Sequence, residues 1–260
     1  MTSTSAPELS VIITTFNRRR TLGAVLRSLE RQTYQTYDRQ RLEVLVVDDG
    51  STDGTTGMLA RYRGPLTLQP LASGLGPDEY GYLLALNIGL QQAHGPYAVF
   101  LDSDMVLHRE ALERMMATHA RWEAQGEQVA VRGWWARRKH PLKLWLRGDH
   151  LRNYRPERAA RARRHRKLRQ LLAHRDRLSP QEAHSAFLSV PTELARRAGG
   201  FAGHVRRYGM DGEFQARLQE RFATRLVLEP GAYAIHGPLR GDVRATRYRH
   251  TRYKGDAGQG

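Results

Sequence analysis

Residues 97–105 read Tyr-Ala-Val-Phe-Leu-Asp-Ser-Asp-Met, an apolar stretch that ends in two carboxylates. The run from Tyr97 to Leu101 predicts a buried strand, and Asp102 and Asp104 follow at its carboxyl end. In an open α/β sheet, ligands bind beside the carboxyl ends of the strands. Two carboxylates there suit Mg²⁺ or Mn²⁺ on a substrate diphosphate, although an Asp-Ser-Asp turn after a strand also caps helices where no metal binds.

Strand-like and helix-like segments alternate along the chain before this stretch. Residues 9–16 and 42–47 are runs rich in β-branched residues, and residues 22–29 between them carry Leu and Val at helical spacing. A strand, a helix and a second strand form a βαβ unit, in which the two strands are parallel. A short strand at 66–70 and a helix at 82–93 then lead into the stretch quoted above. The pattern predicts an α/β fold, a Rossmann-like sandwich of helices around a mostly parallel sheet.

The regular alternation ends after a helix predicted at residues 109–125. Beyond it the pattern predicts strands at 129–133, 186–190, 227–228 and 233–235, and helices at 157–177, 193–198 and 213–221.

Positive charge is concentrated in one part of the chain. The net charge is +16, but residues 132–177 hold 17 basic and 3 acidic side chains, whereas residues 1–131 hold 12 basic and 15 acidic ones. This asymmetry separates a charged binding surface from the body of the domain.

Composition also limits the kinds of site and location that we expect. With no cysteine in the chain, disulfides and thiolate metal sites are excluded, so a metal must be held by oxygen and imidazole ligands. No stretch approaches the roughly 18 apolar residues of a membrane span, and residues 1–8 lack the features of a signal peptide. We therefore expect a cytoplasmic protein.

Polar residues follow several predicted strands at what should be one edge of the sheet. Together these motifs resemble those of the inverting GT-A glycosyltransferases of family 2, from about Leu9 to Met105 and again over residues 186–236. The stretches that carry the resemblance are Val-Ile-Ile-Thr-Thr-Phe-Asn at 11–17, Val-Val-Asp-Asp-Gly-Ser-Thr-Asp at 46–53, Asn-Ile-Gly-Leu at 87–90 and Phe-Leu-Asp-Ser-Asp at 100–104. The resemblance implies a GT-A fold with a basic helical insert in its acceptor half, and a nucleotide-sugar donor, most simply a UDP-sugar.

The resemblance also implies roles for residues in the donor half. Asp49 would accept a hydrogen bond from the uracil N3–H, Asp102 would bind the ribose or uracil, and Asp104 would hold Mn²⁺ or Mg²⁺ on the diphosphate. His236 follows a short strand where several relatives place a third metal ligand, and His250 is the alternative. The other donor contacts are assigned to Thr14, Asn17, Asn87 and Ser103.

Two details of the donor half qualify the resemblance. Asp48, next to Asp49, is expected to order its loop. Leu86 stands where the family commonly has Arg before Asn87, so the phosphate charge must be neutralised elsewhere, with the basic insert and the tail as candidates.

The second half of the chain resembles the acceptor side of the same family. A Gly-Gly-Phe turn at 199–201 precedes a helix whose start carries Asp211, which the resemblance makes the general base that deprotonates the acceptor. Met210 replaces the Glu that usually precedes this Asp. An inverting transfer needs one base opposite the leaving group, so a single carboxylate suffices. Candidate acceptor contacts are Glu213, Trp134 and Trp135.

These assignments divide the chain into five segments. They are a disordered leader at 1–8, a nucleotide-sugar-binding half at 9–131, a basic Trp- and Arg-rich insert at 132–185, an acceptor and catalytic half at 186–238, and a basic flexible tail at 239–260.

The basic insert has three interpretations. It is a solvated helical surface, an acceptor-binding lobe for an anionic substrate, or an attachment to an anionic membrane at its inner surface. The acceptor classes considered are a glycan, a lipid-linked sugar and a peptide.

Two other functions compete with a glycosyltransferase. A nucleic-acid-binding protein would use residues 132–177, but the strand-end carboxylates would repel phosphate without a metal, so this partner is not favoured. A sugar nucleotidyltransferase would usually show a Gly-rich basic loop after the first strand, whereas residues 16–20 have the charge and no glycine.

Overall fold

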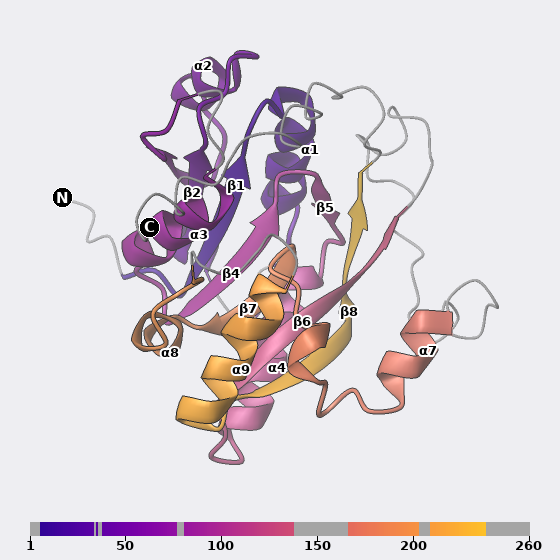
Figure 1. The fold of residues 1–260 in the computed structure, drawn as a ribbon. Helices are drawn as coiled ribbons and strands as arrows, with labels where there is room; N and C mark the ends of the chain where they lie inside the picture. The colour runs from indigo at the N-terminus through magenta and orange to yellow at the C-terminus, as the bar shows by residue number, and fades with distance from the viewer. Residues whose placement is uncertain are drawn as a thin grey trace, which may run out of the picture.

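The computed structural model describes residues 6–33, 35, 38–76, 81–137, 166–202 and 209–237. Within these residues, an eight-stranded sheet lies between two layers of helices (Figure 1). Three regions of the sequence analysis lie outside them: residues 1–5 of the predicted leader, residues 138–165 of the predicted insert, and the whole predicted tail with His250.

Four parallel strands form the first half of the sheet. Their order is β3 (Thr67–Ala72), β2 (Leu42–Asp48), β1 (Leu9–Thr15) and β4 (Tyr97–Asp102). β1 and β2 are buried along their whole length, as expected for apolar runs covered on both faces. The predicted βαβ order is confirmed, and the carboxyl ends of these strands meet at one edge of the sheet.

The second half of the sheet is mixed in direction. β7 (Phe187–Pro191) is antiparallel to β4 and to β6 (Val129–Arg137), while β8 (Arg225–His236) runs parallel to β6. β5 (Met105–Leu107) is the edge strand on this side of the sheet and pairs antiparallel with β8. Two short 3-10 helices, η1 (Arg39–Arg41) and η4 (Pro180–Glu182), lie in the connections.

Helices cover the two faces of the sheet and bury one core on each. α1 (Arg19–Glu30), α2 (Thr55–Ala60) and α4 (Ala111–Glu123) contribute apolar side chains to the first core. The second core takes its apolar side chains from α3 (Tyr82–Gln92), α7 (Arg166–Leu172), α8 (Thr192–Arg197) and α9 (Met210–Phe222). Figure 1 shows α9 in front of β6 and β7, with α4 behind them. The predicted sandwich is therefore confirmed.

The structure corrects several element boundaries. The two strands predicted at 227–228 and 233–235 are one strand, β8, because a register shift between Gly133 and Trp134 of β6 absorbs the irregular residues between them. β5 was not predicted, since three residues are too few to show a period. β6 continues to Arg137, past the predicted start of the insert.

The helix predicted at residues 157–177 is shorter than expected at its carboxyl end. Its described part, α7, ends at Leu172, and residues 173–176 form turns. No described helix combines the length and the apolar character that crossing a lipid bilayer requires.

His119 on α4 is a buried group that makes the stability of the fold depend on pH. Its Nε2 lies 2.8 Å from the Ser189 Oγ of β7, and its ring stacks on Tyr97 of β4 with 4.2 Å between centroids. Burial lowers the pKa of His119 to about 3, so the folded protein keeps this imidazole neutral.

We expect His119→Gln to flatten the pH dependence of stability between about pH 6.5 and pH 3. In that window the unfolded wild-type chain binds a proton at His119 and the folded chain does not. Acidification therefore lowers the free energy of unfolding of the wild type by about 1.4 kcal/mol per pH unit more than that of the variant. Urea unfolding of both proteins at pH 7, 6 and 5 measures the difference, and equal slopes would contradict the assignment.

Candidate functional site

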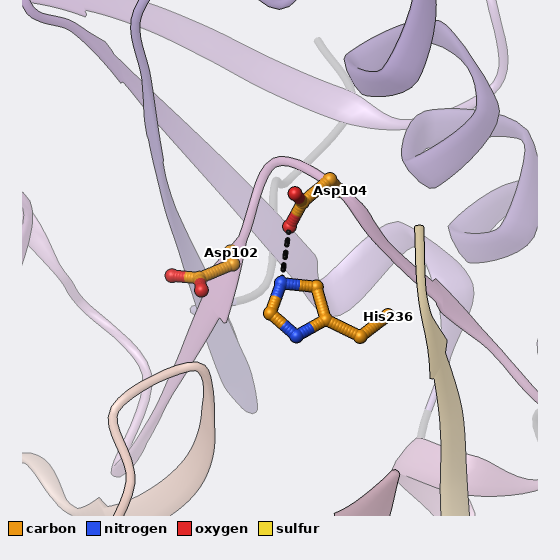
Figure 2. A group of neighbouring side chains, drawn as sticks. All are labelled: Asp102, Asp104 and His236. Carbon is orange, nitrogen blue, oxygen red and sulfur yellow. Dashed lines mark ion pairs between the residues drawn. The ribbon is translucent and has the colours of Figure 1, made fainter. Parts of the chain in front are cut away.

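Asp102, Asp104 and His236 come together at the carboxyl edge of the sheet. Asp102 ends β4, and Asp104 lies in the turn that leads into β5. His236 ends β8 and is the register partner of Met105 in β5, so the pairing of these two strands carries the imidazole to Asp104. Figure 2 shows Asp104 and His236 facing each other with Asp102 beside them. Asp104 Oδ1 lies 3.0 Å from His236 Nε2, and the possible ligand atoms of all three residues lie within 4.8 Å of one another.

Burial and mutual repulsion separate the acidities of the two carboxyls. Burial, followed by the charge of Asp104, raises the pKa of Asp102 to about 6. Burial also opposes ionisation of Asp104, but the hydrogen bond and charge of His236 and the charge of Arg18 outweigh it and lower the pKa of Asp104. Arg18 Nη1 lies 3.8 Å from Asp104 Oδ2. A bound cation at this place would relieve the repulsion between Asp104 and Asp102 that raises the pKa of Asp102.

The donor set of this cluster fits a divalent cation. Carboxylate oxygens and an imidazole nitrogen suit Mn²⁺, and carboxylate oxygens suit Mg²⁺. The geometry adds Asp102 to the possible ligands, in addition to the contact with ribose or uracil predicted for it.

Three further residues with predicted donor contacts line the same edge of the sheet. Thr14 in β1 is the register partner of Asp102, and Ser103 lies between Asp102 and Asp104. Asp49 directly follows β2, and its Oδ2 accepts a hydrogen bond of 2.9 Å from the backbone N–H of Gly81, just before α3. All three are buried, and their contacts with a nucleotide stay predictions.

Asp48 and Asn17 order the loops that follow β2 and β1. Asp48 accepts hydrogen bonds from the Ser51 backbone at 3.1 Å and from the Thr56 hydroxyl at 2.7 Å, which confirms the loop-ordering role predicted for it. Asn17 has a left-handed backbone, with φ of 52°, and its Oδ1 accepts a hydrogen bond of 2.7 Å from the Thr52 backbone. The Asn17 side chain thus joins the two loops, and its donor contact stays a prediction.

Asn87 holds the Gly-Gly-Phe turn directly, and Glu213 supports it through Arg217. Asn87 donates to the Phe201 carbonyl and accepts from the Phe201 N–H, each at 2.8 Å. Gly200 lies so close to Asn87 Oδ1 that a Cβ would meet it at 2.3 Å. Arg217 donates to the Gly200 carbonyl and, at 2.9 Å, to Glu213 Oε2. The donor contact of Asn87 and the acceptor contact of Glu213 stay predictions.

Asp211 lies in the first turn of α9, and one of its carboxylate oxygens is buried without a hydrogen-bond partner among the described residues. It accepts hydrogen bonds from the side chain and the backbone of Ser185, whereas its Oδ1 has no hydrogen-bond partner among the described residues. Burial raises the pKa of Asp211. The Nδ1 of His184 lies 3.9 Å from Asp211 Oδ2, and burial, with the charges of Arg132 and Lys167, lowers the pKa of His184 to about 4. A neutral imidazole therefore stands beside the Asp211 carboxylate at neutral pH.

Tyr82 connects the two sides of the site. Its hydroxyl donates to Asp102 Oδ1 at 3.1 Å and lies 3.1 Å from Ser185 Oγ, which in turn contacts Asp211. Burial, followed by the charges of Asp102 and Asp211, holds the pKa of Tyr82 well above its usual range, so the hydroxyl keeps its proton. Tyr82 and Ser185 thus lie between Asp102 and Asp211.

Sequence reasoning missed Tyr82, Ser185 and His184, because no motif marks them. The two candidate tryptophans differ in position. Trp135 meets His184 edge to face at 5.0 Å between ring centroids, whereas Trp134 is buried among the apolar side chains of the second core. Their acceptor contacts stay predictions.

Comparison with known proteins gives a family match over most of the chain. The model described as "Glycosyl transferase family 2" matches residues 10–176. Glycosyltransferase AglE of Haloferax volcanii is 36% identical over 118 residues, which are 45% of this chain and 37% of AglE. Poly(ribitol-phosphate) beta-N-acetylglucosaminyltransferase TarS of Staphylococcus aureus is 35% identical over 106 residues, which are 41% of this chain and 18% of TarS. The chain thus matches well under half the length of these relatives.

Solved structures resemble the chain over a larger share of its length. Mannosyltransferase PcManGT from Pyrobaculum calidifontis, solved with GDP-Man and Mn²⁺, gives a TM-score of 0.63 at 24% identity, over 92% of this chain and 59% of that chain. Residues 1–349 of S. aureus TarS, solved with UDP-GlcNAc, give 0.62 at 18% identity, over 90% of this chain and 59% of that chain. These likenesses confirm the GT-A fold predicted from the sequence.

We expect His236→Ala to weaken Mn²⁺ binding by about tenfold or more, because the imidazole nitrogen is one of the three possible ligand atoms. Isothermal titration of the nucleotide-free protein with Mn²⁺ measures the affinity. His94→Ala is the matched control, since His94 is exposed and contacts Glu43 at the amino end of β2. Wild-type Mn²⁺ affinity in the His236 variant would remove this residue from the site.

Proposed function

The chain belongs to glycosyl transferase family 2, and on that premise we propose that it is a metal-dependent, inverting glycosyltransferase. The proposed reaction moves a sugar from a nucleotide donor to an acceptor hydroxyl or another nucleophile. The observation that carries the proposal is the cluster of Asp102, Asp104 and His236, which Tyr82 and Ser185 connect to a third carboxylate, Asp211.

The proposed donor is a UDP-sugar bound along the carboxyl edge of the sheet. Asp49 and Asp102 would contact the uracil and the ribose, and a GDP-sugar is the alternative, since structural neighbours are solved with UDP-GlcNAc and with GDP-Man. Asp104 and His236 would hold Mn²⁺ or Mg²⁺. The cation would neutralise negative charge that develops on the leaving diphosphate. The remaining proposed donor contacts are Thr14, Asn17, Asn87 and Ser103.

Arg18 offers the positive charge that position 86 lacks. Leu86 is 1% exposed and packs in the second core, so α3 presents no cation to the site at that position. Arg18 lies just before α1, with its side chain 15% exposed and Nη1 3.8 Å from Asp104 Oδ2. A guanidinium there suits a phosphate oxygen next to the metal position.

Asp211 is the proposed general base. Its unpaired Oδ1 would take the proton of the acceptor hydroxyl while the hydroxyl oxygen attacks the anomeric carbon of the donor sugar. The bond from that carbon to the diphosphate oxygen breaks, the nucleoside diphosphate leaves, and the configuration inverts. The raised pKa of Asp211 supports this role, because a carboxylate with a higher pKa is a stronger base.

The acceptor is proposed only by class: a glycan, a lipid-linked sugar or a peptide. Glu213, Trp134 and Trp135 are the proposed contacts. The cytoplasmic location, the attachment to an anionic membrane and the role of the basic insert also stay proposals, since residues 138–165 lie outside the described part of the chain. The family match and the carboxylate cluster favour a glycosyltransferase over the nucleic-acid-binding and nucleotidyltransferase alternatives.

A binding screen tests the donor proposal. Melting temperatures are measured with a panel of UDP- and GDP-sugars, with and without Mn²⁺. We expect at least one nucleotide sugar to raise the melting temperature only when Mn²⁺ is present, and Asp104→Asn to abolish that shift. If no nucleotide sugar in the panel changes the melting temperature and the protein binds RNA tightly, the proposal is contradicted.

We expect Asp211→Asn to slow sugar transfer by about 10² to 10⁴-fold while nucleotide-sugar binding stays unchanged, because the amide cannot accept the acceptor's proton. Release of nucleoside diphosphate from the donor selected by the screen, with water as the acceptor, measures the rate. Asp176→Asn is the control, since Asp176 is exposed and lies 3.8 Å from Arg121 and Arg175. An unchanged rate in the Asp211 variant would exclude this residue as the base.

A further inference from the structure

Arg132 is a buried cation in the middle of the sheet, and two of its nitrogens have no hydrogen-bond partner among the described residues. β6 has neighbours on both sides at this point, with Leu188 of β7 and Leu228 of β8 as the register partners of Arg132. The residue is 2% exposed, and its Nε and Nη1 have no hydrogen-bond partner among the described residues. Buried polar groups in proteins are nearly always paired, and an unpaired charged one is costly, so this exception calls for a reason.

The nearby carboxylates do not supply the missing partner. Glu182 and Asp211 both interact electrostatically with Arg132, but neither forms a hydrogen bond with it among the described contacts. Glu182 Oε2 accepts instead from the backbone and the hydroxyl of Ser179, at 2.9 and 3.0 Å. Asp211 is held by Ser185. Both carboxylates are therefore fixed by other donors.

The other neighbours of Arg132 leave its charge in place. The guanidinium lies 5.0 Å from the centre of the Trp135 ring, a contact that uses the guanidinium's charge and leaves its N–H groups available. Burial lowers the pKa of Arg132 only to about 10, so the group is charged at neutral pH. Burial and the charges of Arg132 and Lys167 lower the pKa of His184 to about 4, so His184 is neutral at neutral pH. The surroundings of Arg132 thus favour a negatively charged ligand.

We propose that Arg132 is the anchor of an acceptor subsite, in which its unpaired donors bind a phosphate or carboxylate of the acceptor while the unpaired Asp211 Oδ1 receives the acceptor's hydroxyl. The inference rests on the proposed function, because it takes Asp211 as the base. A guanidinium offers only donors, so its complement is an oxyanion, and the unpaired oxygen of Asp211 complements a hydroxyl donor. Arg132 and Asp211 are close enough to interact electrostatically, and one molecule with a hydroxyl near an oxyanion would satisfy both unmatched groups.

Small three-carbon probes test the chemistry of this subsite. Glycerol 3-phosphate and glycerate carry the two oxyanions, and glycerol is the neutral control. Saturating Mg²⁺ and the nucleoside diphosphate selected by the donor screen occupy the donor site first, so that the probes cannot bind in the place of the diphosphate. Saturation-transfer NMR then measures the affinity for each probe. We expect glycerol 3-phosphate or glycerate, and not glycerol, to bind the wild type, and the stronger of the two identifies the oxyanion.

Arg132→Met separates a binding role from a structural one. Methionine keeps the length of the side chain and removes its charge, so we expect at least a tenfold loss of oxyanion affinity together with a higher melting temperature of the ligand-free protein. Arg225→Met is the matched control on the same pair of strands, because Arg225 is exposed and pairs with Glu127 at 3.0 Å. It should leave oxyanion affinity within twofold of the wild type.

The outcomes distinguish this inference from the function on which it rests. The acceptor subsite is overturned if the wild type and Arg132→Met bind the oxyanions equally well, or if the wild type prefers glycerol. In either case, nucleotide binding would still support the proposed donor site. A lower melting temperature for Arg132→Met shows a structural cation and also overturns the inference. If no nucleoside diphosphate binds, the proposed function falls and the acceptor subsite falls with it.

Discussion

The burial of two carboxylates, Asp102 and Asp104, beside each other is the constraint on which the candidate site depends. Like charges out of water repel, and the surrounding elements compensate for that repulsion. β8 delivers His236 to Asp104, the start of α1 delivers Arg18, and α3 delivers the hydroxyl of Tyr82 to Asp102. Asp102 remains the harder carboxyl to ionise, with its pKa raised to about 6 by burial and by Asp104. A divalent cation would complete this compensation, which is the physical basis for a metal at this edge.

The parallel and mixed halves of the sheet meet beside these two buried carboxylates. Tyr82 lies within hydrogen-bond distance of both Asp102 and Ser185, and a tyrosine hydroxyl has only one proton to donate. Ser185 holds Asp211, so the arrangement of the proposed base depends on the same short chain of side chains that supports the carboxylate cluster. The carboxylate cluster and Asp211 therefore share the pair Tyr82 and Ser185, although they come from distant parts of the sequence.

Prediction from the sequence succeeded where the signal is local and strong. The continuous apolar runs of β1, β2 and β4 are typical of strands covered on both faces, and the polar residues at their ends marked the edge of the sheet. Prediction failed where the extent of a strand depends on the strand that pairs with it. β5 is too short to show a period. The sequence pattern of β8 predicts two strands, because the irregular residues after Glu229 hide a register shift that only its pairing with β6 reveals.

The sequence by itself determined the fold class, the edge at which the site lies and the carboxylates Asp102 and Asp104, because strand periodicity and strand-end chemistry are properties of neighbouring residues. Only the tertiary structure decided that His236 meets Asp104, that Tyr82 and Ser185 connect Asp102 with Asp211, and that Arg132 is buried with two nitrogens that have no hydrogen-bond partner among the described residues. Composition shows Arg132 as part of a basic segment, whereas its burial follows from strands β7 and β8 on either side of β6. Burial and pairing depend on contacts between segments far apart in the chain, and no local pattern encodes them.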